Sequence, residues 1–356
     1  MEELSRCRSS PRESCCDLVF EGGGVKGIGL AGAFSVLDEM GYQPQNLAGT
    51  SAGAITAALI AAGYRGEELR QTVLELDFLQ FKDKGWEDKI HLVGKGISLL
   101  LDQGIYEGKR FSAWMDERLA AHGVHTFKDL RTKWTDPRWS SRLQVIVSDL
   151  TAHRLLVLPR DAHLLGLDPL ELKVSEAVRM SMSIPGFFEP VRVTNSNTGE
   201  EHVLVDGGLL SNFPVWLFDC EDEEPAWPTF GLMLVEPEPK HALPKKTHGP
   251  GGLTGLYKLF SELVETLLEA HDRLYLERAQ FARTLTIPTL GVGTTEFDIT
   301  SERALDLYNS GRAAAKTFLA SWNFQAYVEE FRRGKPYIRR ESVRTQFARA
   351  AAMAPA

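Results

Sequence analysis

The chain contains the stretch Asn46-Leu47-Ala48-Gly49-Thr50-Ser51-Ala52-Gly53-Ala54-Ile55, in which a short apolar run leads into a serine between two glycines. An alanine-rich segment follows and ends before Gly63. A strand, a tight turn and a helix in this order are the context of a G-x-S-x-G nucleophile elbow. Side chains at the two glycines would collide with the strand or the helix that the turn joins. Ser51 would lie at the helix N-terminus, where backbone N–H groups favour negative charge. The competing interpretation is a plain turn with a buried serine.

Length and composition are those of a globular protein. The 356 residues are enough for one large domain or two small ones with a substantial core. Hydrophobic residues make up 43% and charged residues 25%, which is ordinary for a soluble protein. The 40 Lys and Arg against 48 Asp and Glu give a net charge of −8, so no overall basic field indicates a nucleic-acid partner.

The four cysteines are Cys7, Cys15, Cys16 and Cys220. None has a metal-ligand spacing with a histidine, so we expect no metal site and free thiols in a reducing compartment. No run approaches the roughly 18 apolar residues that a membrane span requires. Residues 1–16 are polar and lack the apolar core of a signal peptide. The sequence therefore predicts a cytoplasmic protein.

Strands and helices alternate from residue 17 onwards. An apolar strand at 17–20 enters Glu21-Gly22-Gly23-Gly24-Val25-Lys26-Gly27, and a helix with an apolar face follows up to Gly41. The next short strand leads into the elbow around Ser51. Two successive units of strand, glycine turn and helix are typical of an α/β fold with parallel strands.

The middle of the chain extends this pattern. We expect a mostly helical segment at 65–130 to form a cap over the C-terminal edge of the sheet. A helix is predicted at 174–180, and strands are predicted at 143–149, 155–158, 188–193, 202–205 and 230–235. The strands at 188–193 and 202–205 are expected to form a hairpin that ends at Asp206-Gly207-Gly208.

The C-terminal third is expected to be helical apart from one loop. The segment 237–252 is rich in proline, glycine and lysine and is predicted to be that loop. Long helices are predicted at 253–281 and 301–332. We interpret the apolar face of the first as a core face, with a membrane-facing surface as the alternative.

The glycine turn allows two functions. Gly22, Gly24 and Gly27 fit G-x-G-x-x-G between a strand and a helix, as in dinucleotide-binding proteins. The acidic residue that should end the second strand is missing, because that strand leads into the elbow. Three consecutive glycines are better suited to an oxyanion hole, since their N–H groups can converge on one point. Lys26 either adds positive charge there or is solvated on the first helical turn, and we favour a solvated side chain.

A serine nucleophile needs a general base. None of the nine histidines lies in a turn that positions it toward Ser51, so a triad with histidine is not favoured. Asp206 ends a predicted strand in a glycine turn, which would leave it exposed at the edge of the sheet. If that strand lies beside the elbow, Asp206 can contact Ser51 and act without imidazole. Asp149 also ends a strand and is the competing candidate, but it lacks the flanking glycines.

Three motifs occur in order along the chain: Gly22-Gly23-Gly24-Val25-Lys26-Gly27, Gly49-Thr50-Ser51-Ala52-Gly53 and Asp206-Gly207-Gly208. Together they resemble the patatin-like phospholipase family. Residues 148–151 and 181–188, and the pair Asn212 and Pro214, resemble further blocks of that family. The resemblance extends from Asp17 to Val235.

The resemblance implies a fold and a set of site residues. The fold would be a three-layer α/β/α sandwich with a mostly parallel central sheet, a helical cap and extra C-terminal helices. Ser51 would be the nucleophile and Asp206 the general base of a Ser–Asp dyad. The oxyanion hole would comprise Gly22, Gly23, Gly24, Lys26 and Gly27. Both catalytic motifs would be supported by Gly49, Gly53, Gly207 and Gly208.

The activity implied by the resemblance is calcium-independent hydrolysis of phospholipids or lysophospholipids, with no cofactor and no metal. The protein would be cytoplasmic and bind membranes peripherally when active, alone, as a homo-oligomer or with an activating partner. A catalytically silent lipid-binding module on the same fold is the competing function. The expected domains are a polar tail at 1–16, a catalytic domain at 17–300 that includes the cap and the loop, and a C-terminal helix with an arginine-rich tail at 301–356.

Overall fold

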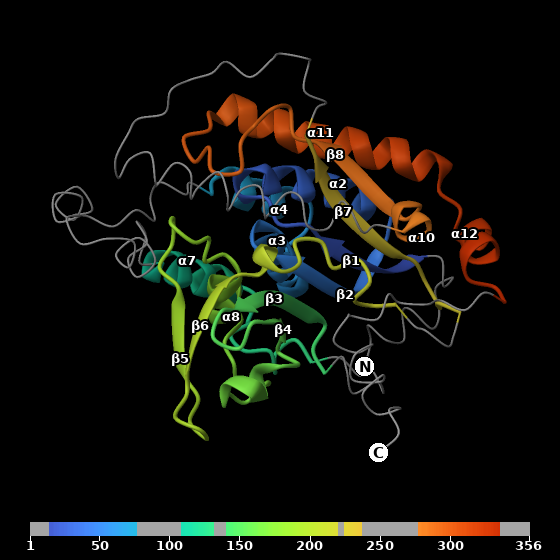
Figure 1. Ribbon diagram of the computed structural model, residues 1–356. Helices are drawn as coiled ribbons and strands as arrows, with labels where there is room; N and C mark the ends of the chain where they lie inside the picture. Colours follow the sequence, from blue (N-terminus) through green and yellow to red (C-terminus); the bar gives the residue numbers. More distant parts are fainter. Residues whose placement is uncertain (1–13, 77–107, 132–139, 220–223, 237–276, 335–356) are drawn as a thin grey trace, which may run out of the picture.

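The computed structural model describes residues 14–76, 108–131, 140–219, 224–236 and 277–334. Figure 1 shows the arrangement of the strands and helices. The strands are β1 (Cys15–Phe20), β2 (Gln43–Thr50), β3 (Leu143–Asp149), β4 (Arg154–Leu158), β5 (Val191–Thr194), β6 (Glu201–Asp206), β7 (Thr229–Val235) and β8 (Thr284–Pro288). The α-helices are α2 (Ile28–Glu39), α3 (Ala52–Ala62), α4 (Gly66–Leu74), α7 (Lys109–Ala120), α8 (Val174–Ser181), α10 (Arg278–Phe281), α11 (Ser301–Ser321) and α12 (Phe324–Phe331). Short 3₁₀ helices are η2 (Gly24–Gly27), η5 (Ala162–Leu165) and η6 (Gly207–Leu209).

The described strands form one eight-stranded sheet. Its order is β5-β6-β3-β2-β1-β7-β8, and β4 pairs with β3 outside this path. The neighbouring strands β3, β2, β1, β7 and β8 are parallel to one another. β4 and β6 run antiparallel to β3, and β5 runs antiparallel to β6. The predicted α/β fold with a mostly parallel sheet and flanking helices is therefore confirmed, as is the hairpin, which is formed by β5 and β6.

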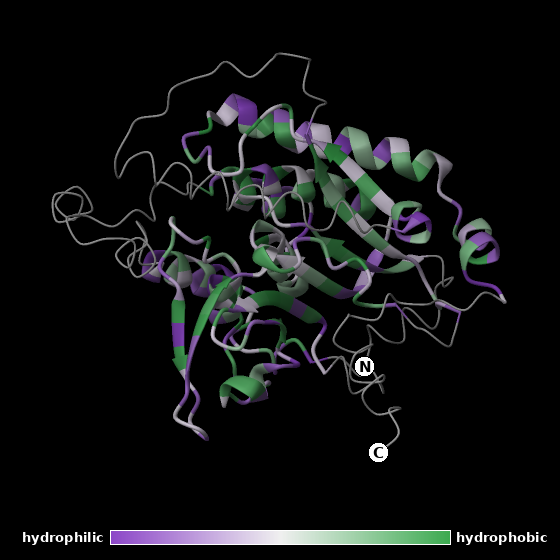
Figure 2. Cartoon of the chain, viewed as in Figure 1, coloured by the Kyte–Doolittle hydropathy of each residue, from purple (hydrophilic) through white to green (hydrophobic). Residues whose placement is uncertain are grey.

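The two faces of the sheet bury different side chains of the same strands, because successive residues of a strand point to opposite faces. In β1, Leu18 and Phe20 belong to a large core that also contains buried residues of α2, α3, α8 and α11. Val19 belongs to a smaller core on the other face, together with Phe213 and further apolar residues of 213–218. Figure 2 shows hydrophobic residues concentrated in the central strands, whereas α11 carries hydrophilic residues along much of its length.

The described part of the predicted cap consists of two helices. α4 packs against α2, and α7 packs against α8. Their buried side chains, among them Leu69 and Phe111, belong to the large core. These helices are therefore part of the helical layer on the sheet. Residues 77–107 of the predicted cap lie outside the described residues, and the proposed domain boundaries stay predictions.

The C-terminal region differs from the prediction in two places. The predicted helix at 301–332 is divided into α11 and α12, because Trp322 is extended and the Asn323 side chain caps α12 by accepting from the Ala326 N–H. Residues 284–288 form β8, which was not predicted from the sequence and which extends the sheet beside β7. The predicted loop at 237–252 and most of the predicted helix at 253–281 lie outside the described residues.

Two of the cysteines near the N-terminus, Cys15 and Cys16, are part of the sheet. Both are buried, and Cys15 is the first residue of β1. Cys16 is a free thiol, and burial raises its pKa. Cys15 is disulfide-bonded, and its partner is not among the described residues. The expectation of four free thiols is therefore wrong, because proximity of two cysteines depends on the folded chain and not on their spacing in the sequence.

Candidate active site

Ser51 occupies the turn between β2 and α3 and is the N-cap residue of α3. Its backbone angles are φ 53° and ψ −124°, a conformation that non-glycine residues rarely adopt. Such a conformation costs on the order of 1–3 kcal/mol and persists only where the surrounding structure enforces it. Ser51 lines a cavity at the C-terminal end of β2. A strained serine between a strand and a helix is the geometry of a nucleophile elbow.

The two glycines of the elbow lie where no side chain fits. A Cβ atom on Gly49 would be 2.3 Å from the carbonyl oxygen of Gly53. A Cβ atom on Gly53 would be 2.4 Å from the carbonyl oxygen of Phe20, in β1. Both contacts are with backbone atoms, which cannot move without displacing a strand or the helix. Glycine at positions 49 and 53 is therefore required by the close approach of β1, β2 and α3.

Asp206 lies next to the elbow because β2 and β6 pair with successive stretches of the same edge of β3. Thr50, the last residue of β2, pairs with Ile146 of β3, and Asp206, the last residue of β6, pairs with Val147. β4 pairs with β3 along both of these stretches and therefore occupies its opposite edge. The ends of β2 and β6 thus meet head to head, and Ser51 and Asp206 line the same cavity.

The expectation that Asp206 is exposed at the sheet edge is wrong. β6 lies between β3 and β5, and the exposed fraction of Asp206 is 0%. Its Oδ1 accepts a hydrogen bond from the Gly208 N–H at 2.8 Å, whereas its Oδ2 has no partner of normal hydrogen-bond geometry among the described residues. Burial raises the pKa of Asp206 to about 7, against smaller lowering effects of the Ser51 side chain and the Gly208 N–H. Ser51 is therefore close enough to interact with a carboxyl group that titrates near neutral pH.

Gly22, Gly23 and Gly24 of the glycine turn after β1 line the same cavity. The Gly22 N–H donates to the Asn212 carbonyl at 3.1 Å, and the Asn212 side chain donates back to the Gly22 carbonyl at 3.1 Å. In the described part of the chain, the N–H groups of Gly23 and Gly24 have no such partner. Two donors next to Ser51 are therefore available to a bound group.

Lys26 also lines the cavity, but it is not solvated as expected. Its exposed fraction is 3%, and its Nζ lies 2.9 Å from Glu236 Oε1. Glu236 follows β7, the parallel neighbour of β1, so the two chain segments leave the sheet at the same edge. The contact joins residues that are far apart in the sequence, and for this reason the local pattern around Lys26 gave no sign of it.

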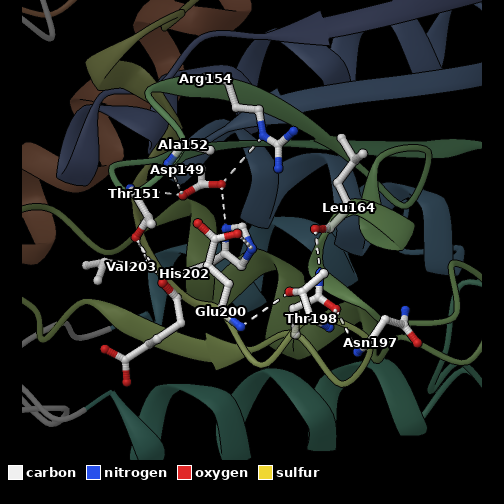
Figure 3. Close-up of polar contacts among 12 residues, drawn as sticks. Asp149, Thr151, Ala152, Arg154, Leu164, Asn197, Thr198, Glu200, His202 and Val203 are labelled. Carbon is white, nitrogen blue, oxygen red and sulfur yellow. Dashed lines mark hydrogen bonds and ion pairs between the residues drawn. The ribbon is translucent and has the colours of Figure 1, made fainter.

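Asp149, the competing candidate for the base, lies in a different environment (Figure 3). Its Oδ1 accepts from the N–H groups of Thr151 and Ala152, each at 3.1 Å. Its Oδ2 lies 2.9 Å from Nδ1 of the buried His202 and 3.6 Å from Nε of Arg154. Both carboxylate oxygens thus contact groups of the β3–β4 turn, of β4 or of β6, and Asp149 does not line the cavity with Ser51.

The remaining predicted site residues lie around the cavity rather than in its lining. Gly27 ends η2, and Gly207 and Gly208 begin η6 directly after Asp206. Further lining residues are Glu21, Ile184, Asn212, Leu234 and Thr294. Of these, Ile184 and Asn212 belonged to blocks that the sequence resemblance had marked. Glu21 directly precedes the glycine turn, whereas Leu234 and Thr294 come from separate segments and carry no local signal of their position.

Clusters of metal-binding side chains and membrane-spanning helices are both lacking among the described residues. In those segments, no group of three or more His, Cys, Asp and Glu side chains could hold a metal ion. None of the helices described here is long and apolar enough to cross a membrane.

The described residues form an α/β fold with one cavity that both Ser51 and Asp206 line. The model of the patatin-like phospholipase family matches residues 18–219, so the chain belongs to this family, whose members are lipid hydrolases. The three motifs around the cavity all fall within the matched range.

Similar proteins include bacterial relatives and a solved structure. The chain is 37% identical over 308 residues to the uncharacterized protein YqhO of Bacillus subtilis, which covers 86% of this chain and 99% of that protein. It is 28% identical over 267 residues to an uncharacterized NTE family protein of Mycobacterium tuberculosis, covering 72% of this chain but only 38% of the longer relative. VipD from Legionella pneumophila shares the fold, with a TM-score of 0.51 and 18% identity over 88% of this chain and 67% of VipD.

Proposed function

We propose that the protein is a calcium-independent serine hydrolase that releases fatty acids from phospholipids or lysophospholipids. One observation supports this most strongly: a strained serine, a buried carboxyl group and two backbone N–H donors without partners line one cavity. Family membership supports the substrate class, because members of the family are lipid hydrolases.

In the proposed reaction, Asp206 accepts the proton of the Ser51 hydroxyl while Oγ attacks the ester carbonyl carbon. The carbonyl oxygen becomes an oxyanion, which accepts hydrogen bonds from the N–H groups of Gly23 and Gly24. Preorganised donors of this kind each contribute roughly 10²–10³ in rate. Asp206 then returns the proton to the alcohol that leaves, and the fatty acid remains esterified to Ser51.

The second half of the reaction repeats the same proton transfers. Asp206 accepts a proton from a water molecule that attacks the acyl-enzyme, and the C–O bond to Ser51 breaks. The proton returns to Ser51 Oγ and the fatty acid leaves. A carboxyl group with a pKa of about 7 suits both directions, since a general acid–base catalyst works best when its pKa lies near the working pH.

A phospholipid substrate determines where the protein would act and which partners it could have. A phospholipid is presented in a membrane, so we propose that the protein acts at a membrane surface without spanning it. A homo-oligomer or an activating partner would be compatible with this function. The competing proposal is a lipid-binding module without turnover, and retention of Ser51, Asp206 and the glycine turn argues against it.

A serine-reactive fluorophosphonate probe separates the two functions. We expect the probe to label the wild type at Ser51, located by mass spectrometry of the digested protein, and not to label Ser51→Ala. Ser35→Ala is a suitable control, because Ser35 is also buried but bonds to the Gly32 carbonyl within α2, away from the cavity. Absence of labelling in a folded wild type would favour the silent module.

A further inference from the structure

The C-terminal end of α8 contacts the backbone of both proposed catalytic residues. The Ser51 N–H donates to Ser181 Oγ at 2.9 Å. The Asp206 N–H donates to the carbonyl oxygen of Ser183 at 2.9 Å. Ser181 and Ser183 are both fully buried. Residues 181–183 therefore bind the proposed nucleophile through Ser181 and the proposed base through Ser183.

The hydroxyl of Ser181 makes two hydrogen bonds with opposite roles. It accepts from the Ser51 N–H and donates to the Ile146 carbonyl of β3 at 2.6 Å. Because an N–H only donates and a carbonyl only accepts, the orientation of this hydroxyl is fixed by its two partners. Ile146 also pairs with Thr50, the residue before Ser51. Ser181 thus links the elbow to the strand that aligns β2 with β6.

Ser183 holds Asp206 through its main chain rather than its side chain. Its hydroxyl donates to the Arg179 carbonyl at 2.8 Å and accepts from the Arg179 guanidinium. The same guanidinium donates to the Glu189 carbonyl at 2.8 Å. These bonds fix the turn itself, while the contact with Asp206 depends on a carbonyl that every residue carries.

From these contacts we infer that Ser181 is a positioning residue for Ser51, and this inference rests on the proposed function. The peptide that joins Thr50 to Ser51 leads into a strained backbone conformation, with φ 53° at Ser51. Ser181 is the acceptor that holds the N–H of this peptide. Without it, a buried N–H and a buried carbonyl lose their partner, and the elbow can relax toward an ordinary conformation. Ser51 Oγ would then move relative to Asp206 and to the glycine turn.

The test compares two serine-to-alanine variants of the same helix. Ser181→Ala removes both hydrogen bonds to the elbow and β3. Ser175→Ala is the matched control, because Ser175 is buried in α8 and its hydroxyl donates to Asp116 Oδ1 at 2.7 Å, away from the cavity. Steady-state hydrolysis of a short-chain ester gives kcat and KM, thermal unfolding gives the loss of stability, and fluorophosphonate gives the reactivity of Ser51.

We expect Ser181→Ala to lower kcat by about 10- to 100-fold, because misplacement of a reacting group by about 1 Å costs on that order. KM should change by less than about twofold, and labelling should slow in step with kcat, since the lost contact affects the reacting serine and not substrate binding. Ser175→Ala should lose a similar amount of thermal stability but keep wild-type kcat. A merely structural role would lower stability in both variants and kcat in neither.

Ser181→Thr retains the hydroxyl. If the hydrogen bonds cause the effect, its kcat should be at least about tenfold higher than that of Ser181→Ala. If Ser181→Ala does not fold, Ser181→Cys replaces it with the same expectation, because a thiol donates and accepts only weakly. Equal kcat in the Ser181 and Ser175 variants would overturn the positioning role while the wild type still hydrolyses esters. A wild type that neither turns over nor labels would instead overturn the proposed function and this inference together.

Discussion

Thr50 and Asp206 end their strands against neighbouring residues of β3, Thr50 opposite Ile146 and Asp206 opposite Val147. Since β2 runs parallel and β6 antiparallel to β3, the two chain ends point toward each other. Ser51 follows Thr50 directly, so the spacing between the proposed nucleophile and base depends on a central strand of the sheet and not on a mobile loop. Sites built on such elements hold their geometry more closely than sites on loops.

Asp206→Asn should lower turnover strongly while preserving the fold. The amide has nearly the same shape and its oxygen can still accept from the Gly208 N–H, but it cannot take the proton from Ser51. General acid–base catalysis contributes about 10²–10⁴ in rate, and we expect kcat to fall by that amount. Circular dichroism verifies the fold.

Asp149→Asn serves as the control for Asp206→Asn. Asp149 accepts hydrogen bonds in its own turn and does not line the cavity, so its variant should lose stability more than turnover. Esterase assays of the two folded variants side by side check this. Full activity in Asp206→Asn together with an inactive Asp149→Asn would identify Asp149 as the base.

The rate should depend on pH with the titration of Asp206. Burial raises the pKa of its carboxyl group to about 7, and only the ionised form can accept a proton from Ser51. We therefore expect kcat/KM for an uncharged ester to reach a plateau above pH 7 and to fall by up to about tenfold per pH unit below it. A value of kcat/KM that stays constant from pH 5 to pH 8 would contradict the role of Asp206.

Stability should depend on pH through a second buried carboxyl group, Asp17 at the start of β1. Burial raises its pKa to about 7, although hydrogen bonds from Asn46 and Trp227 lower it in part. Its pKa in the unfolded chain is about 3.9, so the folded state binds the proton more tightly. The resulting stability is fully present below about pH 4 and is lost as the pH rises to about 7, at about 1.4 kcal/mol per pH unit.

Asp17→Asn removes this dependence because an amide does not titrate in this range. The free energy of unfolding, measured with urea, should change between pH 5 and pH 7.5. We expect this change to be about 2 kcal/mol smaller in the variant than in the wild type. Asp17 lies outside the proposed active site, so the pH profile of kcat/KM should stay as in the wild type. The same pH dependence of unfolding in both proteins would show that Asp17 is ionised in the fold.

Ser51→Gly should be more stable than Ser51→Ala. Glycine adopts positive φ without steric cost, whereas alanine keeps the strain that the angles of Ser51 impose. The strain is worth on the order of 1–3 kcal/mol, and the greater entropy of unfolded glycine offsets about 1 kcal/mol, which leaves a gain of about 1 kcal/mol. Urea unfolding of the two inactive variants measures the difference. A lower stability of Ser51→Gly would show that the conformation of Ser51 is not strained.

Much of the fold and part of the site could be predicted from local sequence. The glycine turn, the elbow and the Asp206 motif each consist of a few consecutive residues whose steric demands are visible in the chain itself. The alternation of short apolar strands with helices likewise predicted the α/β class. β8 was overlooked because its five residues lie between segments with strong helical patterns.

The properties that depend on distant contacts could not be predicted in this way. The burial of Asp206 goes with its pairing opposite Val147 of β3 and the hydrogen bond of its N–H to the Ser183 carbonyl, which the local sequence does not reveal. The ion pair of Lys26 depends on the parallel pairing of β1 with β7. The contact of Ser181 with the Ser51 N–H likewise joins an α-helix to an elbow that lies far away in the sequence.

Fatty-acid release from phospholipid vesicles in EDTA, measured for the wild type beside Ser51→Ala, tests the proposed function most directly. We expect release by the wild type alone, because the proposed reaction uses Ser51, Asp206 and backbone N–H groups and needs no calcium. Lysophospholipid presented in the same vesicles extends the test to the second substrate. Equal release by both proteins, or no release of fatty acid from either lipid by a folded wild type, would contradict a serine lipid hydrolase.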